Sequence, residues 1–479
     1  MKLTGFLFAA ALLGACTQPA AEENYTRHVD PKIGTGGHGH VFVGANVPFG
    51  LVQVGPTSIP QTWDWCSGYH ASDSTVIGFS HTHLSGTGIG DLFDITVMPV
   101  VGEVTYARGE ENDPASGLWS YADRTREITK PGYYSVPLVR YGITAELTAT
   151  ERVGLHRYTF PASDAAAVVF DLENGGCWDK ATETHLAKEG DRTVTGWRHS
   201  TGWAKDQRVY FAAEFSKPFE KFETIGDNYA RASFRTTDGE QVSLKVALSP
   251  VSIEGAKANL AAELPGWDFD ATAAAADKAW NDELSKVKIE TEDETSKRIF
   301  YTALYHTMVA PSLFCDVNGD YRGADGKVHE NPGRDTYTTF SLWDTYRAAM
   351  PLMTVLHPER MPDIIQTMLH IADEQGRLPV WHLWGNETDC MVGNPGIVAV
   401  ADAIVKGIGG FDREKAFEAI RKTAMNPDRG NGLRMEYGYI PCEMFNEAVA
   451  YDMEYALADG AAARAAEALG KAEDAKYFE

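Results

Sequence analysis

RYTFPASDAAAVVF, residues 157–170, contains two β-rich runs that decide the fold of the first half of the chain. Aromatic, β-branched and other apolar residues dominate 157–160 and 167–170, and residues 208–211 and 242–246 repeat the pattern. Several short runs of this kind, separated by Gly, Asn and Asp turns, are typical of an antiparallel sandwich. We therefore predict a β-sandwich domain over residues 25–258.

Beyond this region the sequence changes from strand-like to helical. Residues 259–277 are rich in Ala and acidic side chains, which predicts a helical linker over 259–292. From residue 293 onward apolar residues recur at helical spacing, as Phe300, Leu304 and Met308 do. Further helices are predicted at 341–356 (kinked at Pro351), 362–374, 397–408, 413–425 and 448–469. The fold class is therefore α+β and multidomain, with a helical domain over 293–479.

The composition indicates a folded and strongly acidic protein. Of the 479 residues, 44% are apolar and 11% aromatic, which excludes a disordered chain. The 43 Lys and Arg against 67 Asp and Glu give a net charge of −24. A chain this acidic lacks the basic surface that nucleic-acid binders use, so we expect no nucleic-acid partner.

Residues 1–16 predict a lipoprotein signal peptide. Lys2 precedes an apolar run that ends in Leu13-Gly14-Ala15-Cys16, which is similar to a bacterial lipobox. The resemblance implies that Cys16 is lipidated and, because Thr17 follows it rather than Asp, that the anchor lies in the outer membrane, on its periplasmic or surface side. An ordinary secretory signal that ends near a cysteine is the alternative. No later run reaches the ~18 apolar residues that a membrane span needs.

Other local patterns argue against common metal and nucleotide sites. Five cysteines remain after Cys16, so at least one is unpaired within the chain, and no Cys/His cluster has the spacing of a structural zinc site. IGTGGHGH (33–40) lacks the GK[ST] of a phosphate loop and predicts a tight turn that places His38 and His40. DVNGD (316–320) has Lys327 where a calcium loop requires Glu, which favours a hairpin turn.

Two loops of the first half have the composition of a sugar-binding surface. WDWCSGYH (63–70) supplies Trp63 and Trp65, and GFSHTHLSGTG (78–88) supplies His81 and His83. Indole faces stack on the apolar face of a pyranose, while imidazoles hydrogen-bond its hydroxyls. The alternatives are a metal pair at His81 and His83, and a loop core in which the histidines have structural partners.

Two stretches of the second half contain further candidates. FSLWDTYR (340–347) begins a predicted helix capped by Ser341, on which Trp343, Asp344 and Arg347 either contact sugar hydroxyls or form a salt-bridged helix start. LPVWHLWGNETDCM (378–391) contains Glu387 and Asp389, in a loop that is otherwise an ordinary connector. Because glycoside hydrolysis uses two carboxyl groups, the acidic residues of these stretches are the candidates that the chain itself offers.

Taken together, these stretches resemble glycoside hydrolase family 92, the bacterial exo-acting α-mannosidases. The resemblance rests on WDWCSGYH (63–70), GFSHTHLSGTGIGD (78–91), FSLWDTYRA (340–348) and GNETDCMVG (385–393), in the family's order, with a weaker match at 453–459. It implies an N-terminal β-supersandwich, a helical linker and an (α/α)6 toroid, with the active site between them. It also implies calcium-dependent inverting hydrolysis that releases terminal α-linked mannose, with α-1,2 linkages of N-glycans or mannans as the expected substrates.

The chain departs from the family pattern in the catalytic stretches. The family's general-acid Glu, calcium-binding Asn-Glu and base Asp belong to toroid motifs that do not occur in these 479 residues. We therefore expect an incomplete toroid with uncovered apolar helix faces, calcium ligands beyond residue 479 and no turnover, and we assign no catalytic or metal-binding residue. The expected substrate contacts are Trp63, Trp65, His81, His83, Trp343, Asp344, Arg347 and Glu387.

Two other functions stay open at this point. One is a non-catalytic, glycan-binding lipoprotein that retains the aromatic surface. The other is a toroid α-glucosidase in which Glu387 is the acid. The sequence sets neither the oligomeric state nor the linkage specificity.

Overall fold

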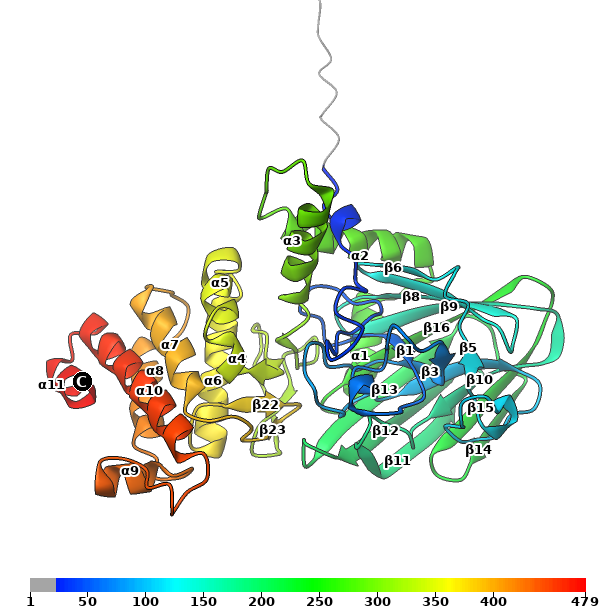
Figure 1. Cartoon of the computed structure of the whole chain (residues 1–479). Helices are drawn as coiled ribbons and strands as arrows, with labels where there is room; N and C mark the ends of the chain where they lie inside the picture. Colours follow the sequence, from blue (N-terminus) through cyan, green and yellow to red (C-terminus); the bar gives the residue numbers. More distant parts are fainter. Residues whose placement is uncertain (1–22) are drawn as a thin grey trace, which may run out of the picture.

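The computed structural model describes residues 23–479, and two antiparallel sheets pack face to face in its first half (Figure 1). The six-stranded sheet has the order β1-β3-β4-β10-β15-β14 and the eight-stranded sheet the order β11-β12-β13-β16-β9-β8-β7-β6. The strands of the first sheet are β1 (Gly55–Thr57), β3 (Gly78–Ser80), β4 (Thr96–Val101), β10 (Ser163–Asp171), β14 (Lys221–Ile225) and β15 (Tyr229–Thr236). Those of the second are β6 (Ile128–Lys130), β7 (Tyr133–Leu138), β8 (Ile143–Ala149), β9 (Val153–Phe160), β11 (Lys180–Glu189), β12 (Thr193–Thr201), β13 (Gln207–Phe215) and β16 (Glu240–Ser249).

The core of the sandwich lies between these two sheets. Phe170 of β10 stacks on Phe211 of β13 with ring centroids 6.0 Å apart, and Phe79 of β3 stacks on Tyr158 of β9 at 6.4 Å. The last six residues of β10 are all buried, because this strand lies inside its sheet between β4 and β15. The sandwich predicted from the β-rich runs is therefore confirmed, and all four runs lie in strands.

The helical part begins earlier than the sequence predicted. The last strand of the sandwich ends at Ser249, and α1 (Ile253–Glu263) starts before the expected boundary at 258. Ser252 caps this helix by accepting a hydrogen bond from the Gly255 N–H at 3.0 Å. Two further helices, α2 (Phe269–Leu284) and α3 (Glu294–His306), lie beside the sandwich (Figure 1).

Helices and short strands make up the rest of the chain. The helices are α4 (Leu342–Thr345), α5 (Ala349–Leu356), α6 (Met361–Gln375), α7 (Pro395–Val405), α8 (Arg413–Ala424), α9 (Asn431–Tyr437), α10 (Ala448–Ala468) and α11 (Ala472–Phe478). The strands are β17 (Ser312–Leu313), β18 (Tyr321–Arg322), β19 (Val328–His329), β20 (Tyr337–Thr338), β21 (Phe340–Ser341), β22 (Trp381–Leu383) and β23 (Asn386–Glu387), and the first half adds the pair β2 (Thr75–Val76) and β5 (Ser120–Tyr121). A sheet-rich N-terminal part is thus followed by a helical C-terminal part, as predicted.

The predicted helix at 341–356 is two separate helices, and the expected kink at Pro351 is absent. It divides into α4 and α5 before Ala349, so Pro351 lies in the first turn of the second helix, where its missing N–H costs little. The expected cap is also different, because the Ser341 hydroxyl donates to the Asp344 carboxylate and makes no hydrogen bond to the helix backbone. The DVNGD stretch forms the expected turn, in which Asp316 N–H donates to the Asp320 carbonyl at 2.9 Å.

Specific hydrogen bonds connect the two parts. The Trp280 indole on α2 is fully buried and donates to the Asn46 carbonyl at 2.7 Å. Phe49 N–H donates to the Met308 carbonyl at 2.8 Å, and Leu313 N–H returns a bond to the Phe49 carbonyl at 2.9 Å. These backbone bonds fix the loops of the sandwich against the segment that follows α3.

Some apolar side chains are exposed on the outer helices. On α10, Val449 and Met453 are each 70% exposed, and Tyr477 of α11 is 64% exposed. Among the described residues no helix is long and apolar enough to cross a membrane. All five described cysteines are free thiols, which agrees with the expectation that at least one is unpaired.

Candidate active site

A cavity of about 520 Å³ lies where loops of the sandwich meet the helical part. Its walls are mainly aromatic and aliphatic, with backbone groups of a Gly-rich loop and a few polar side chains. Loops of the sandwich contribute Trp63, residues 85–89 and Trp203, and the helical part contributes, among others, His306, Thr339, Phe340, Asp344, Met350 and Trp381. Two of the eight predicted contacts, Trp63 and Asp344, line this cavity.

Trp63 forms an aromatic wall on the sandwich side. It lies in the 3-10 helix η2 (Trp63–Trp65) and is 49% exposed, and its indole N–H donates to the Gly88 carbonyl at 2.8 Å. A Cβ atom at Gly88 would come within 2.4 Å of the Trp63 ring, so only glycine permits this contact. The two motif loops therefore fix the indole with one face available to the cavity.

A pair of indoles closes the cavity across the junction. Trp203, in the loop after β12, contacts Trp381 of β22 with ring centroids 4.7 Å apart at 65°. Asp91 holds the Trp203 loop, because its carboxylate accepts hydrogen bonds from the N–H groups of Trp203 at 3.0 Å and Ala204 at 2.8 Å. Burial raises the pKa of the Asp91 carboxyl, and these N–H donors oppose that shift. The sequence prediction omitted Trp203 because no motif surrounds it.

Asp344 is the carboxylate of the cavity. It lies on α4 and is exposed, and the Ser341 hydroxyl donates to it. Thr339, three residues before the start of α4, has φ of 64°, a left-handed conformation that a β-branched residue seldom adopts. The cavity wall thus includes a backbone strain of the kind that clusters at functional sites.

His306 is a cavity residue that sequence reasoning missed. It ends α3, its Nε2 is buried, and this nitrogen has no hydrogen-bond partner among the described residues. Burial lowers the pKa of its imidazole to about 4, so the ring is neutral at pH 7. A neutral ring with a free nitrogen can exchange a hydrogen bond with a bound hydroxyl. No local pattern marked this residue, which ends an otherwise ordinary amphipathic helix.

Three of the predicted sandwich contacts are directed elsewhere. Trp65 donates its indole N–H to Asp73 at 2.7 Å and stacks on His70, away from the cavity. His81 is fully buried, with Nδ1 2.6 Å from the Ile95 carbonyl and Nε2 2.9 Å from His156. Burial lowers the pKa of His81 to about 3.

His83 is buried in the same way. Its Nδ1 lies 2.8 Å from the Gln53 carbonyl, and burial lowers its pKa to about 4. The structure therefore matches the alternative of a loop core in which both histidines of this motif are structural, with His83 packed between Phe42 and Phe93.

The three remaining predicted contacts stabilise the helical part rather than line the cavity. The Arg347 guanidinium covers the Trp343 ring at 4.4 Å and pairs with Glu454 at 2.6 Å, not with Asp344. Glu387 accepts hydrogen bonds from three backbone N–H groups, at 2.8 to 3.0 Å, from Val380, Trp381 and Asp389. Glu387 thus fixes the start of β22, the strand that presents Trp381.

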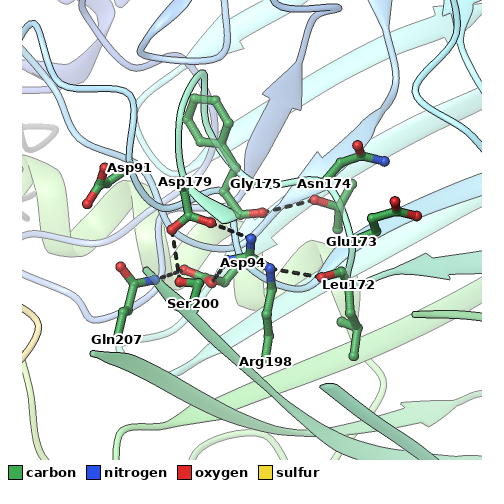
Figure 2. Close-up of polar contacts among 12 residues, drawn as sticks. Asp91, Asp94, Leu172, Glu173, Asn174, Gly175, Asp179, Arg198, Ser200 and Gln207 are labelled. Atoms are coloured by element: carbon green, nitrogen blue, oxygen red, sulfur yellow. Dashed lines mark hydrogen bonds and ion pairs between the residues drawn. The ribbon is translucent and has the colours of Figure 1, made fainter. Parts of the chain in front are cut away.

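A larger hollow of about 650 Å³ lies on the sandwich, but its chemistry is different. Its lining is polar and contains no aromatic side chain, and it borders a buried ion network around Arg198 on β12 (Figure 2). The Arg198 guanidinium pairs with Asp94 at 2.7 Å and with Asp179, and Nε donates to the Leu172 carbonyl at 3.0 Å. Ser200 and Gln207 supply further donors to these two carboxylates. The charges of this network are paired with one another, so we place the candidate site in the aromatic cavity.

The comparisons with known proteins match both parts of the chain to one family. Residues 28–249 match the family model described as the glycosyl hydrolase family 92 N-terminal domain, and residues 255–479 match the one described as its catalytic domain. The cavity is lined by side chains from both matched regions. A secreted, uncharacterized glycosidase of the fungus Arthroderma benhamiae is 26% identical over 515 residues, covering 96% of this chain and 61% of the relative.

Two solved structures share the fold closely. An α-mannosidase of family GH92 from Bacteroides thetaiotaomicron, in complex with mannoimidazole, has a TM-score of 0.91 and 38% identity over 95% of this chain and 63% of that one. An inverting mannosidase of the same family and species has a TM-score of 0.85 and 28% identity over 96% of this chain and 64% of that one. The chain thus spans a little less than two thirds of the length of these relatives.

Proposed function

Because the chain belongs to glycosyl hydrolase family 92, we propose that it serves the removal of terminal α-linked mannose from N-glycans or mannans. The supporting observation is the cavity at the junction, which joins the Trp63 wall to the carboxylate of Asp344. An indole face suits the apolar face of a hexose, and a carboxylate accepts hydrogen bonds from its hydroxyls. The α-1,2 linkage is part of the proposal and rests on the resemblance alone.

In this proposal each cavity residue has a distinct binding role. Trp63 stacks on one face of the terminal sugar, while Trp203 and Trp381 exclude water from the opposite end. Asp344 accepts hydrogen bonds from two neighbouring hydroxyls, and neutral His306 supplies one further partner. The pyranose is then held in one orientation with its glycosidic oxygen toward the open side of the cavity.

We infer that the acid and base of the reaction do not lie among the described residues. Inverting hydrolysis uses two carboxyl groups roughly 6.5–9.5 Å apart. Among the described lining residues Asp344 is the one carboxylate, and Glu387 is engaged by backbone N–H groups. We therefore propose that the 479 residues by themselves bind mannosides without turnover, which also keeps a glycan-binding role open. The same engagement of Glu387, away from the cavity, argues against an α-glucosidase in which it is the acid.

Calcium belongs to the proposal through the resemblance, and the cavity residues alone do not fit it. Calcium takes six to eight oxygen ligands, several of them carboxylates. The described cavity offers one carboxylate beside hydroxyl and carbonyl oxygens, which is too few acidic ligands to hold the ion.

The location in the cell is also proposed. We infer an outer-membrane lipoprotein anchored through Cys16, with the cavity on the periplasmic or surface side. The signal sequence and Cys16 lie outside the described residues, and the support is the lipobox-like stretch alone.

A binding assay tests the proposed site. We expect methyl α-mannoside, titrated calorimetrically with and without calcium, to bind the full chain, and Trp63→Ala and Asp344→Asn each to weaken binding at least tenfold. Trp197→Ala removes an indole on the sandwich outside the cavity and is the matched control, expected to bind normally. Unchanged binding in both cavity variants would refute the location, and release of mannose from α-1,2-mannobiose would refute the absence of an acid–base pair.

A further inference from the structure

Three potential metal ligands meet beside the aromatic wall of the cavity. Asp64 Oδ1 lies 2.6 Å from His38 Nδ1 and 3.2 Å from His40 Nε2, and one ligand atom from each of the three residues fits within a 4.8 Å span. His38 is 76% exposed at its side chain, whereas His40 is nearly buried and Asp64 is 21% exposed. The cluster is therefore anchored on one side and open to solvent on the other.

The backbone is built to bring the two histidines to one carboxylate. His40 has φ of 53°, a left-handed conformation, and the turn before it passes so close to itself that a Cβ atom at Gly39 would lie 1.9 Å from the Gly34 carbonyl oxygen. The sequence predicted this tight turn but no metal site. Asp64 is 24 residues further along, so neither residue spacing nor a known motif marked the cluster.

A second cluster of this kind in the described residues already contains a positive charge. Glu283, His357 and Glu359 also meet within ligand distance, but the Lys286 ammonium lies among them, 2.8 Å from Glu283 and 3.0 Å from Glu359. A built-in cation thus neutralises that cluster. Within residues 23–479 no lysine or arginine pairs with Asp64, whose side-chain partners are the two histidines.

We propose that His38, His40 and Asp64 bind a divalent transition-metal ion of the Zn²⁺ class. Two imidazoles and one carboxylate suit Zn²⁺, Co²⁺ or Ni²⁺, whereas calcium requires oxygen ligands. Ligand atoms on a tetrahedral zinc lie ~3.4 Å apart when each bond is about 2.1 Å. By that standard the two distances to Asp64, 2.6 and 3.2 Å, each need a change of less than about 1 Å, which the exposed His38 ring helps to make. Three protein ligands leave a fourth position for water or a substrate group.

The site is coupled to the cavity through Trp63. Its ring lies 4.2 Å from the His40 ring and 5.6 Å from the His38 ring, measured between centroids. A metal ion that fixes both imidazoles therefore restrains the indole that forms the cavity wall. This site is separate from the calcium proposed above, because its donors are mainly nitrogen and it lies on the sandwich side.

Metal titration of the full chain, stripped by a chelator, tests the proposal. We expect one Co²⁺ or Zn²⁺ per chain, a visible Co²⁺ spectrum of nitrogen and oxygen ligation, and quenching of Trp fluorescence by Co²⁺ that Trp63→Phe diminishes. His38→Ala and Asp64→Asn should each weaken binding at least tenfold. His185→Ala, which removes an imidazole stacked on Trp197 at 4.3 Å, is the matched control and should bind normally.

The outcomes separate this site from its competitors. A thiolate charge-transfer band, which free cysteines would produce, overturns the proposal, as does binding that His38→Ala and Asp64→Asn leave unchanged. Absence of saturable binding overturns it as well. Thermal unfolding separates lost binding from lost folding. The unfolding temperature of His38→Ala should match that of the parent chain because His38 is exposed, and Asp64→Asn should also match because Asn keeps the size of the side chain. The test is independent of mannoside binding, so its failure leaves the proposed function unaffected.

Discussion

Replacing Arg198 by Met tests how the sandwich tolerates its buried charges. The guanidinium is fully buried and pairs with Asp94 and Asp179, which are also buried (Figure 2). Met has a similar length and no charge, so Arg198→Met leaves two carboxylates without their counter-ion. The Leu172 carbonyl loses its donor at the same time.

The expected cost follows from the burial. Removing one partner of a buried ion pair typically costs about 3–5 kcal/mol, because the remaining charge stays desolvated. The free energy of unfolding at pH 7 should fall by that amount. With an m-value of about 3 kcal/mol per M, the urea midpoint of the sandwich should fall by roughly 1–1.7 M.

The cost should also depend on pH. Burial raises the pKa of the Asp179 carboxyl to about 6, against the opposing effect of Arg198, and the neighbouring charge of Asp94 adds to the rise. Without Arg198 the pKa of Asp179 rises further, so the folded variant takes up a proton that the unfolded chain binds only near pH 4. The destabilisation should therefore be largest at pH 7 and become smaller as the pH falls to 5.

Urea unfolding at pH 5 and pH 7, followed by tryptophan fluorescence, measures both effects. Arg235→Met is the matched control, because Arg235 pairs with Glu220 on the surface and its loss should have little effect. A loss below about 1 kcal/mol for Arg198→Met, or a loss that is equal at both pH values, would refute the reasoning.

Three further predictions concern other contacts. Glu387→Ala should lower the free energy of unfolding by about 2–3 kcal/mol, because three backbone donors lose their acceptor; unchanged urea midpoints would contradict this. Burial raises the pKa of Asp316 to about 6, so the folded state binds a proton more tightly than the unfolded chain does. The stabilisation that this proton gives is lost as the pH rises from about 4 to 6. The stability of Asp316→Asn relative to the parent chain should accordingly increase over that range and then level off, and a flat difference in urea unfolding would exclude the shift. Cys16→Ser should move the protein from the membrane to the soluble fraction of expressing cells, whereas retention in the membrane fraction would argue against the lipid anchor.

The fold could be predicted from sequence because its signals are local. Apolar and β-branched runs such as 167–170 form strands wherever a second sheet covers them, and β10 is buried in this way. The helix boundaries were less accurate near Ala349, because the break between α4 and α5 depends on contacts that are distant in sequence. Ser341 likewise has the composition of a cap, but Asp344 competes for its hydroxyl.

The site could be predicted only in part, because burial is not a local property. The pattern His81-x-His83 is compatible with a pair of metal ligands, yet both rings are buried in the sandwich. There each ring makes a hydrogen bond to a backbone carbonyl, His81 to that of Ile95 and His83 to that of Gln53. Conversely, Trp203 and His306 have no motif around them and are brought to the cavity by the fold.

Two motif residues affect the cavity indirectly, by holding residues that line it. Asp91 and Glu387 do not line it, but each accepts a backbone N–H of one member of the Trp203–Trp381 pair. Because the two indoles belong to different parts of the chain, these carboxylates set the position of a contact across the junction. The motifs therefore specify the geometry of the cavity as much as its surface. Substitutions at Asp91 or Glu387 should weaken ligand binding because they displace the indoles, not because they remove a direct contact with the ligand.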